Sequence, residues 1–326
     1  MSTERSVARK HHYVPQCYLR GFVRHPEKPR LAVLDMARRK MFETSPENVA
    51  AERDFHAINV EGHPPDALEQ AFSKFEGELA PAISRIVDAQ SLTNDIDLNC
   101  VLNFIALLVV KNPRKRAQLI DFQADLWRKI AQVVTSDRKI WETTIKHAQA
   151  AGELRDISPV SYQAVRDFVT RGAYDVHVPT TKNLALELAA HDTVLRTLAD
   201  RKWTLFRAPR ESVGFITSDH PVCLMWSDPP RGALMPPGHG LAGTHLLFPL
   251  HKRLALLGSF EDTARTHDLS ADGVARVNGA VIHHAHKQVY GQSLDFYYQL
   301  SASGKAKQGR NLLLDRFTLH TRGRPR

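Results

Sequence analysis

The stretch DALEQAFSKFEGELAPAISRIVDAQ (Asp66–Gln90) has the most regular pattern in the chain. Its apolar residues recur every three or four positions, which places them on one face of a helix. They are Leu68, Phe72, Phe75, Leu79, Ile83 and Ile86. Pro64 and Pro65 stand directly before the stretch, and Pro81 stands inside it. We therefore predict a long amphipathic helix with a kink at Pro81.

Helical patterns continue on the C-terminal side of this stretch. The apolar run VLNFIALLVV (Val101–Val110) is typical of a buried helix, and NPRKR (Asn112–Arg116) ends it. The helices predicted after the first one cover roughly 98–110, 119–130, 138–151, 160–171 and 181–200. We expect residues 66–200 to be almost entirely helical.

The sequence on either side of this helical region has the short apolar runs of strands. RLAVLDMARRKMFETS (Arg30–Ser45) places two such runs around a basic turn and predicts a hairpin. After residue 200, β-branched and aromatic runs bounded by Gly, Pro and Asp predict further strands. These runs are KWTLFRAP, GFITSDHPVCLMW, THLLFPL and RLALLGSF, and one more helix is predicted over Ala271–His286. The predicted fold class is α+β, with a mostly helical middle (about 66–200), a β-rich C-terminal part and an N-terminal hairpin.

Bulk properties are those of an ordinary folded protein with a basic balance. The 326 residues are 43% hydrophobic and 24% charged, and the net charge of +9 favours contact with a polyanion such as nucleic acid. The three cysteines are far apart and form no CxxC pair, which fits a reducing compartment. The longest apolar run is about half of a membrane span, and the N-terminus has no signal-peptide core. We expect a cytoplasmic protein with no membrane segment.

The composition along the chain also indicates its domain organisation. We expect residues 1–10 to be a disordered basic tail, and the final RGRPR (Arg322–Arg326) to be mobile as well. Residues 11–326 are expected to form a single α+β domain, because no flexible linker marks a boundary. A subdivision into 11–200 and 201–326 is the alternative.

The first candidate site is KHHYVPQCYLRGF (Lys10–Phe22). Its proline restricts the preceding residue to extended geometry, so His11 and His12 lie on an extended segment and point to opposite faces. Gln16 and Arg20 are four apart on the helix predicted to follow and share one face of it. One interpretation is a polar pocket wall made by one histidine, Gln16 and Arg20. The other is that the histidines brace the helix and its aromatic residues belong to the core.

This stretch resembles the N-terminal signature of a prokaryotic family of unknown function, DUF4238, which reads His-His-Tyr-Val-Pro-Gln-x-Tyr-Leu-x-x-Phe. Later stretches are similar to that family too: LEQAFSKFEGELAPAI (Leu68–Ile83), NPRKR, and FITSDHPV (Phe215–Val222) followed by FPL. The resemblance covers nearly the whole chain. It implies a shared fold, and it brings no activity with it.

A weaker resemblance connects the same stretch to His-Me finger nucleases of the HNH type. Their HHxxP pattern is similar to His11 through Pro15, and Asn48 and His56 follow at some distance. The resemblance implies a histidine that deprotonates water beside a divalent metal. A helix is expected after Pro15, where that fold needs a strand, which argues against the relationship.

Acidic residues supply the second group of candidates. Glu69 and Glu76 are seven positions apart, at the border of the apolar stripe on the first helix. Together with His12 they are predicted ligands of a divalent metal, Mg²⁺ or Mn²⁺, or an acid and base pair; the alternative is an ordinary charged helix edge. Asp219, at a predicted strand end, is either a further carboxylate of this site or a turn former. Its neighbours Ser218 and His220 cannot form a triad with it, because triad members must meet across space.

Two further patterns are basic. In NPRKR, Arg114 and Arg116 lie where a helix begins, and its free N–H groups make this a predicted phosphate site; the alternative is a solvated corner. In RVNGAVIHHAHKQ, Arg276 and His283 have a spacing similar to the motif of HEPN ribonucleases, a short pattern that chance easily supplies. The chain has neither a Walker A motif nor GxGxxG.

Together these patterns favour a nuclease that cleaves RNA or DNA phosphodiesters, in a defence or toxin role. The predicted catalytic residues are His11, His12, Gln16, Arg20, Glu69, Glu76 and Asp219. A non-catalytic sensor or adaptor that holds an anionic ligand is the main alternative. A hydrolase or transferase acting on NAD or another nucleotide is the third hypothesis.

Overall fold

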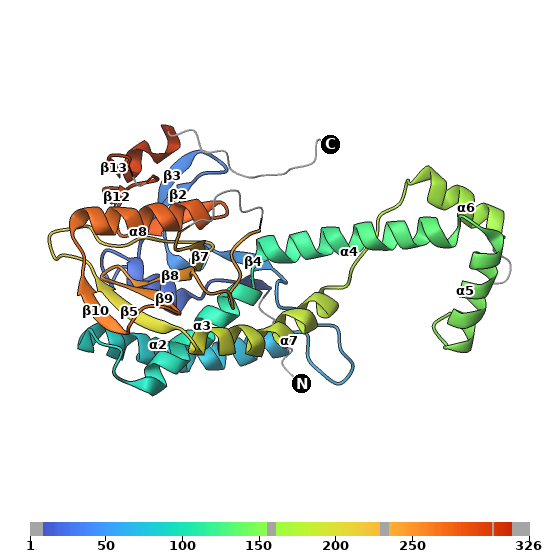
Figure 1. Cartoon of the computed structure of the whole chain (residues 1–326), viewed down its shortest axis with the longest axis horizontal. Helices are drawn as coiled ribbons and strands as arrows, with labels where there is room; N and C mark the ends of the chain where they lie inside the picture. The colour runs from blue at the N-terminus through green and yellow to red at the C-terminus, as the bar shows by residue number, and fades with distance from the viewer. Residues whose placement is uncertain (1–8, 155–160, 229–234, 302, 315–326) are drawn as a thin grey trace, which may run out of the picture. The chain divides into compact units, whose positions relative to one another are not determined.

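A computed structural model describes residues 9–154, 161–228, 235–301 and 303–314. The chain divides into two compact units: Met1–Asn112 together with Glu187–Arg326, and Pro113–Leu186 (Figure 1). These bounds differ from the subdivision at residue 200 considered above. Most of the predicted N-terminal tail and all of RGRPR lie outside the described residues. The α+β class is confirmed: helices fill the middle of the chain, and most strands lie in its C-terminal part.

Two main sheets form the β part of the first unit. The five-stranded sheet has the order β10-β5-β9-β8-β7, and its neighbours are antiparallel except for β10 with β5. Its strands are β5 (Lys202–Arg207), β7 (Cys223–Trp226), β8 (Thr244–His251), β9 (Leu254–Ser259) and β10 (Arg265–Asp268). β8 and β9 are interior strands of this sheet, and their apolar runs are buried on both faces.

The four-stranded sheet contains the predicted N-terminal hairpin. Its order is β3-β2-β11-β6, with all pairs antiparallel. Its strands are β2 (Leu31–Asp35), β3 (Lys40–Thr44), β6 (Thr217–Ser218) and β11 (Gln288–Gly291). The hairpin turns at the basic run, where Arg39 has a positive φ. Two small two-stranded sheets also belong to this unit: β1 (Lys10–His12) with β4 (Ala51–Arg53), and β12 (Tyr297–Tyr298) with β13 (Lys307–Gln308).

The helices of the first unit pack against these sheets. They are α1 (Gln16–Leu19), α2 (Ala67–Ala89), α3 (Asp95–Val110), α8 (Ala271–His284), the C-terminal part of α7 (Thr180–Ala199), and the 3₁₀ turns Arg20–Phe22, Pro46–Asn48 and Gly309–Leu314. On α2, the C-terminal half of the predicted stripe is buried, and the N-terminal half is half-buried around the site described below. Within the described part of the chain, no single helix is long and apolar enough to cross a membrane. The helices α3 and α4 (Pro113–Val134) reach that length and hydropathy only when they are counted together as one bent pair.

Tyr18 joins the N-terminal motif to both main sheets. Its hydroxyl lies 2.6 Å from the carbonyl oxygen of Pro249 on β8 and 2.7 Å from Oγ1 of Thr217 on β6. Its ring contacts those of Phe22, Phe104 and Phe248. A buried hydroxyl with two partners inside an aromatic cluster is a core element. The aromatic residues of the motif therefore have the structural role that one of the two interpretations gave them.

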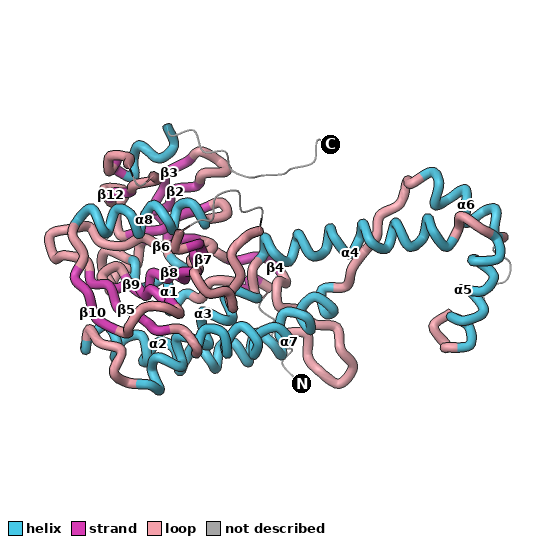
Figure 2. The backbone as a smooth tube through the Cα atoms, viewed as in Figure 1, coloured by secondary structure: helices cyan, strands magenta, loops and turns pink. Residues whose placement is uncertain are grey.

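The described part of the second unit consists of helices joined by loops (Figure 2). It holds α4 (Pro113–Val134), α5 (Arg138–Ala150), α6 (Tyr162–Arg171) and the beginning of α7. Asp137 and Ser161 cap α5 and α6 by accepting from backbone N–H groups, and Gly172 ends α6 with a φ of 64°. Unlike the stripe on α2, the apolar side chains Phe122, Leu126 and Ile130 of α4 are exposed.

Candidate functional site

The pairing of two short strands decides which N-terminal histidine enters the site. β1 (Lys10–His12) and β4 (Ala51–Arg53) form an antiparallel ladder in which His11 lies opposite Glu52. His11 is buried. The adjacent His12 is half-buried, and its Nε2 lies 3.1 Å from the carbonyl oxygen of Glu47. The two side chains therefore have different surroundings, as the alternation of an extended chain requires.

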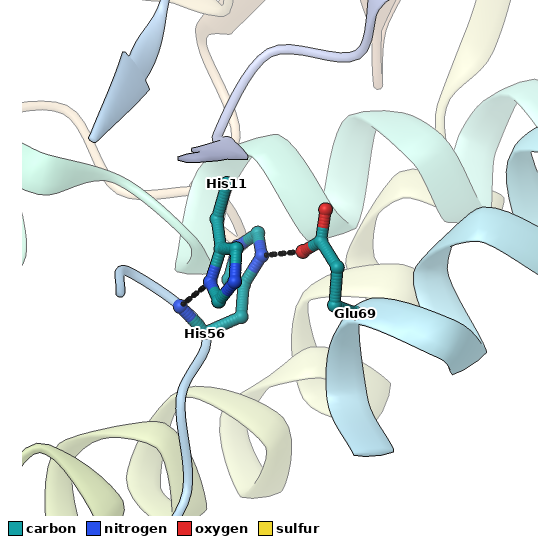
Figure 3. A group of neighbouring side chains, drawn as sticks. All are labelled: His11, His56 and Glu69. Atoms are coloured by element: carbon teal, nitrogen blue, oxygen red, sulfur yellow. Dashed lines mark hydrogen bonds and ion pairs between the residues drawn. The ribbon is translucent and has the colours of Figure 1, made fainter. Parts of the chain in front are cut away.

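His56 lies in the turn after β4 and is 0% exposed. Its backbone N–H donates to Nδ1 of His11 over 2.9 Å. The two imidazole rings stack, with centroids 5.5 Å apart and planes 10° from parallel (Figure 3). The rings of Phe55 and Phe72 meet the His56 ring at steep angles, with centroids 5.0 and 4.7 Å away. His56 is thus held by one hydrogen bond and three ring contacts.

Glu69 completes the group from the first turn of α2. Its Oε2 lies 2.6 Å from Nδ1 of His56, on the side of the ring away from the His11 hydrogen bond (Figure 3). The free N–H groups at the start of a helix favour a carboxylate at this position. Burial opposes ionisation of Glu69, but the bond from His56 and the charge of Lys111 act against burial, and the pKa of Glu69 is lowered overall.

The protonation of the two rings follows from their hydrogen bonds. Burial is the largest effect on His56 and lowers its pKa to about 4, with Glu69 opposing and Lys111 assisting. The neutral ring donates its Nδ1 proton to the Glu69 carboxylate, so Nε2 keeps a lone pair. That Nε2 is buried and has no hydrogen-bond partner among the described residues. His11 accepts a backbone N–H at Nδ1, so its neutral ring carries the proton on Nε2.

The same three side chains could also hold a metal ion. One ligand atom from each of His11, His56 and Glu69 lies within 4.8 Å of the others. Two imidazoles and a carboxylate form a set that suits Zn²⁺, Mn²⁺ or Fe²⁺ better than Mg²⁺, which prefers oxygen ligands. Binding through Nδ1 of His56 would require its proton to leave and the bond to Glu69 to be replaced.

A buried cation lies next to this group. Lys111 follows α3, and its Nζ lies 4.1 Å from the ring centroid of Phe72, which in turn contacts His56. Glu76 lines a small cavity with Lys111 and Phe72. Burial raises the pKa of Glu76; the charge of Lys111 lowers it and that of Glu69 raises it further. Lys111 therefore acts electrostatically on both predicted acids of α2.

The structure brings only part of the predicted site together. Glu69 meets His11, whereas Glu76 and His12 lie outside the group of three possible metal ligands. Burial is the largest cause of the lowered pKa of His12, and the charges of Glu69 and Lys111 also act on it, so it is an electrostatic neighbour of the group. Gln16 is half-buried and Arg20 is exposed.

Asp219 has a structural environment of its own. Its buried carboxylate accepts from the backbone N–H groups of His286, Lys287 and Gln288, at 2.7 to 3.0 Å. Burial raises its pKa to about 6, against the effect of these three bonds. The carboxylate fixes the chain between α8 and β11, and it is not among the group of possible metal ligands in the described residues. Of the two predicted roles, this environment matches that of a residue that holds a turn.

The basic patterns lie apart from this group in the sequence and in the elements that carry them. Arg114 and Arg116 belong to the first turn of α4, which begins the second unit; Arg114 is half-buried and Arg116 is buried. Arg276 and His283 are both exposed on α8.

Two residues here have only a weak signal in the sequence. His56 is indicated only through the resemblance to His-Me finger nucleases, and Lys111 stands directly before the basic run NPRKR. The signal available for His56 was its position shortly before the predicted acidic helix start that holds Glu69. Asn48, its companion in that resemblance, instead accepts from Lys10 and donates to Thr44 and Ser45.

Comparison with known proteins gives one match. The model of a family described as protein of unknown function (DUF4238) matches residues 10–295. No curated protein matches the chain. No solved structure matches it either.

Proposed function

The chain belongs to the DUF4238 family of proteins of unknown function, and from this premise we propose that its centre of His11, His56 and Glu69 cleaves phosphodiester bonds, with RNA as the preferred substrate. The observation that carries the proposal is the state of His56. Oε2 of Glu69 accepts a hydrogen bond from Nδ1 of His56. Nε2 of His56 is therefore an acceptor; it is buried and has no partner among the described residues. A carboxylate that orients an imidazole in this way is the arrangement of a general base.

The chemistry assigns one task to each group. Nε2 of His56 takes the proton from the 2′-hydroxyl of RNA, and the 2′-oxygen attacks the neighbouring phosphorus. The bond from phosphorus to the 5′-oxygen breaks, the 5′-oxygen takes a proton from solvent, and a 2′,3′-cyclic phosphate remains; His56 then returns its proton to solvent. Lys111 supplies positive charge to the phosphate in the transition state. The net charge of +9 favours the polyanionic substrate.

RNA is preferred over DNA because it carries its own nucleophile. A neutral imidazole at pH 7 can accept the proton of a 2′-hydroxyl that lies next to the scissile bond. DNA lacks this hydroxyl and needs an activated water, which metal ions usually supply. The pKa of about 4 keeps His56 neutral at pH 7 before reaction, and the Glu69 carboxylate on Nδ1 would stabilise the imidazolium that forms when Nε2 takes the proton.

The proposal requires access to a buried atom. Glu69 is 29% exposed at its side chain, so the centre meets solvent at the first turn of α2. The connection from β4 leads into this turn, and its residues 59–65 are all exposed. The proposal requires a local movement here that opens a path for a substrate hydroxyl to Nε2 of His56.

A divalent metal is the second candidate mechanism, favoured by the clustering of three ligand atoms within 4.8 Å. In that case His11, His56 and Glu69 would bind the ion, which would activate a water for attack on RNA or DNA alike. Mn²⁺ and Zn²⁺ suit this ligand set better than Mg²⁺.

One experiment tests the function and separates the two mechanisms. Labelled RNA and DNA of identical sequence are incubated with the protein in EDTA, Mg²⁺, Mn²⁺ or Zn²⁺, and the purified protein is assayed for bound metal by mass spectrometry. RNA cleavage in EDTA that leaves a 2′,3′-cyclic phosphate supports the base mechanism. Cleavage of both substrates only with metal, together with about one bound ion per chain, supports the metal mechanism. No cleavage under any condition contradicts the proposed function.

Variants connect the activity to the centre. His56→Gln and Glu69→Gln should each abolish most of the cleavage. His63→Gln is the matched control, because His63 is an exposed histidine of the same connection between β4 and α2. If His56→Gln fails to fold, Glu69→Gln, at a partly exposed position, still decides the question. Equal activity of Glu69→Gln and wild type would remove this centre from the mechanism.

A further inference from the structure

The second unit contains a cavity of about 690 Å³ that the proposed catalytic centre does not use. It lies between α4, the segment that joins α6 to α7, and the first turns of α7. Gln123 and Trp127 line it from α4, Val178 and Pro179 from the segment, and Lys182 from α7. All of these residues belong to the unit Pro113–Leu186. The volume is in the range of sites for small organic ligands.

A buried amide oxygen at this cavity lacks a partner. Oε1 of Gln123, a lining residue, is buried and has no hydrogen-bond partner among the described residues. A buried polar atom without a hydrogen bond is costly, which favours a partner from outside the chain. This oxygen would accept a hydrogen bond from an N–H group of a ligand.

The walls of the cavity suit a flat ring. Trp127 is 54% exposed although it is the largest side chain of the lining, so its indole is free to stack. The other walls of the cavity carry few polar groups, because the segment and α7 contribute mainly aliphatic side chains such as Val178, Pro179 and Leu186. Aromatic and aliphatic walls with a few amides are typical of sites that hold a heteroaromatic base.

One cationic side chain lines the same cavity. It is that of Lys182, which is exposed. No ion pair of Lys182 occurs within the described residues. A cation beside a stacking platform would bind an anionic group attached to the ring.

We propose that this cavity binds a nucleotide, with the base stacked on Trp127 and hydrogen-bonded to Gln123, and the phosphate beside Lys182. A planar ring with N–H donors, joined to a negative charge, is the one common ligand class that uses all of these features. The nucleotide is either free or one residue of a single-stranded nucleic acid. The site is argued from the second unit alone and does not rest on cleavage at the first.

Isothermal titration calorimetry on the full chain tests the proposal. The probes are AMP, GMP, CMP, UMP, adenosine, inorganic phosphate and a ten-nucleotide single strand. We expect at least one nucleotide or the single strand to bind, and inorganic phosphate not to compete at equal concentration. Binding of the mononucleotide identifies a free nucleotide as the ligand, and binding of the strand alone identifies a nucleotide within a chain.

Variants locate the binding. Trp127→Ala and Gln123→Leu should each weaken it by about tenfold or more. Lys182→Ala should weaken AMP but leave adenosine within twofold. Phe122→Ala is the matched control, because Phe122 is exposed on α4 and does not line the cavity. The proposal is overturned if no nucleotide or strand binds at millimolar concentration, or if binding survives within twofold in both Trp127→Ala and Gln123→Leu.

Discussion

Nδ1 of His56 lies 2.6 Å from Oε2 of Glu69, and this bond decides which nitrogen of the ring carries the proton. A carboxylate can only accept, so the Nδ1–H group of His56 is the donor. Nε2 of the neutral ring then carries a lone pair, and it is buried inside the protein. The backbone N–H of His56 donates to Nδ1 of His11, and this second hydrogen bond fixes the position of the residue. Both the position of His56 and the nitrogen that carries its proton are therefore fixed by contacts within the protein.

The first prediction concerns the charge of Glu69. In Glu69→Gln the side-chain oxygen can still accept from His56, but the negative charge that stabilises a protonated imidazole in the transition state is lost. We expect RNA cleavage to fall by about 100-fold or more, with a smaller change in KM. Steady-state kinetics at pH 7 measure this.

Glu78→Gln is the control for this change, since Glu78 is an exposed glutamate on the same helix. Its kinetics should match those of wild type. A similar loss in both variants would mean that the effect comes from α2 in general, and the assigned role of Glu69 would be wrong.

The second prediction is a dependence of stability on pH that His56 causes. Its pKa is about 4 in the folded protein and about 6.5 in the unfolded chain, so between these values the unfolded state binds more protons. The contribution of His56 is fully present above pH 6.5 and is lost as the pH falls toward 4, by roughly 3 kcal/mol in total.

Urea unfolding at several pH values from 7.5 to 4.5 measures this contribution. His56→Gln does not titrate, so its free energy of unfolding should approach that of wild type as the pH falls. His251 also has a pKa lowered to about 4, by burial first, and it titrates in both proteins. A wild-type minus variant difference that stays constant over this range would contradict the buried, neutral state of His56.

The sequence predicts the helices and strands of this fold better than the tertiary contacts between them. The hairpin and the helices between residues 66 and 200 follow from local periodicity, which each segment carries in its own residues. The contact of His11 with His56 spans 45 positions and depends on the ladder of β1 with β4, whose strands are only three residues long. No local pattern shows such a pairing, so His12 and Glu76 were the predicted companions of Glu69.

Two further differences have the same physical origin. The three N–H groups that surround Asp219 come from residues 67 to 69 positions further along the chain. An apolar stripe predicts an amphipathic helix, but the sequence does not say whether a partner covers it; on α2 the stripe is largely covered, whereas on α4 Phe122, Leu126 and Ile130 are exposed. Periodicity determines the face of a helix, and tertiary packing determines what meets it.

The third prediction tests the structural role of Asp219. Asn offers one oxygen where the carboxylate offers two, so Asp219→Asn leaves at least one of the three backbone N–H groups without an acceptor. We expect a loss of about 2–3 kcal/mol in the free energy of unfolding at pH 7, with kcat of the folded protein unchanged. Thermal or urea unfolding, together with kinetics well below the transition, measures both quantities.

Asp295→Asn is the comparison for this variant, because Asp295 pairs with Arg310 at an exposed position. It should change stability by less than about 1 kcal/mol. If Asp219→Asn folds as stably as Asp295→Asn yet loses catalysis, Asp219 belongs to the reaction and not to the fold.

The fourth prediction compares two helical glycines. A Cβ at Gly279 on α8 would lie 1.7 Å from the carbonyl oxygen of Gln299, a backbone atom that cannot move aside alone. Gly77 on α2 has nothing within 4 Å of its Cβ position. Gly279→Ala should destabilise by about 3 kcal/mol or more, whereas Gly77→Ala should stabilise by about 0.5–1 kcal/mol. Equal effects in urea unfolding would contradict the close packing of α8 on the segment around β12.

The last prediction concerns Lys111, the buried cation beside the centre. Its charge lowers the pKa values of both Glu69 and Glu76, so Lys111→Met should raise both. Met keeps the aliphatic length of the side chain, but it leaves two partly buried carboxylates without a neighbouring cation, which costs stability. We expect cleavage to fall by about 100-fold because the proposed transition state loses the positive charge of Lys111, and we expect the free energy of unfolding at pH 7 to fall as well. Lys111→Arg should retain part of the activity. The pKa of Glu76 is followed by carbon-13 NMR of its carboxyl, and a pKa that is unchanged in Lys111→Met would show that the lysine does not act on this carboxyl.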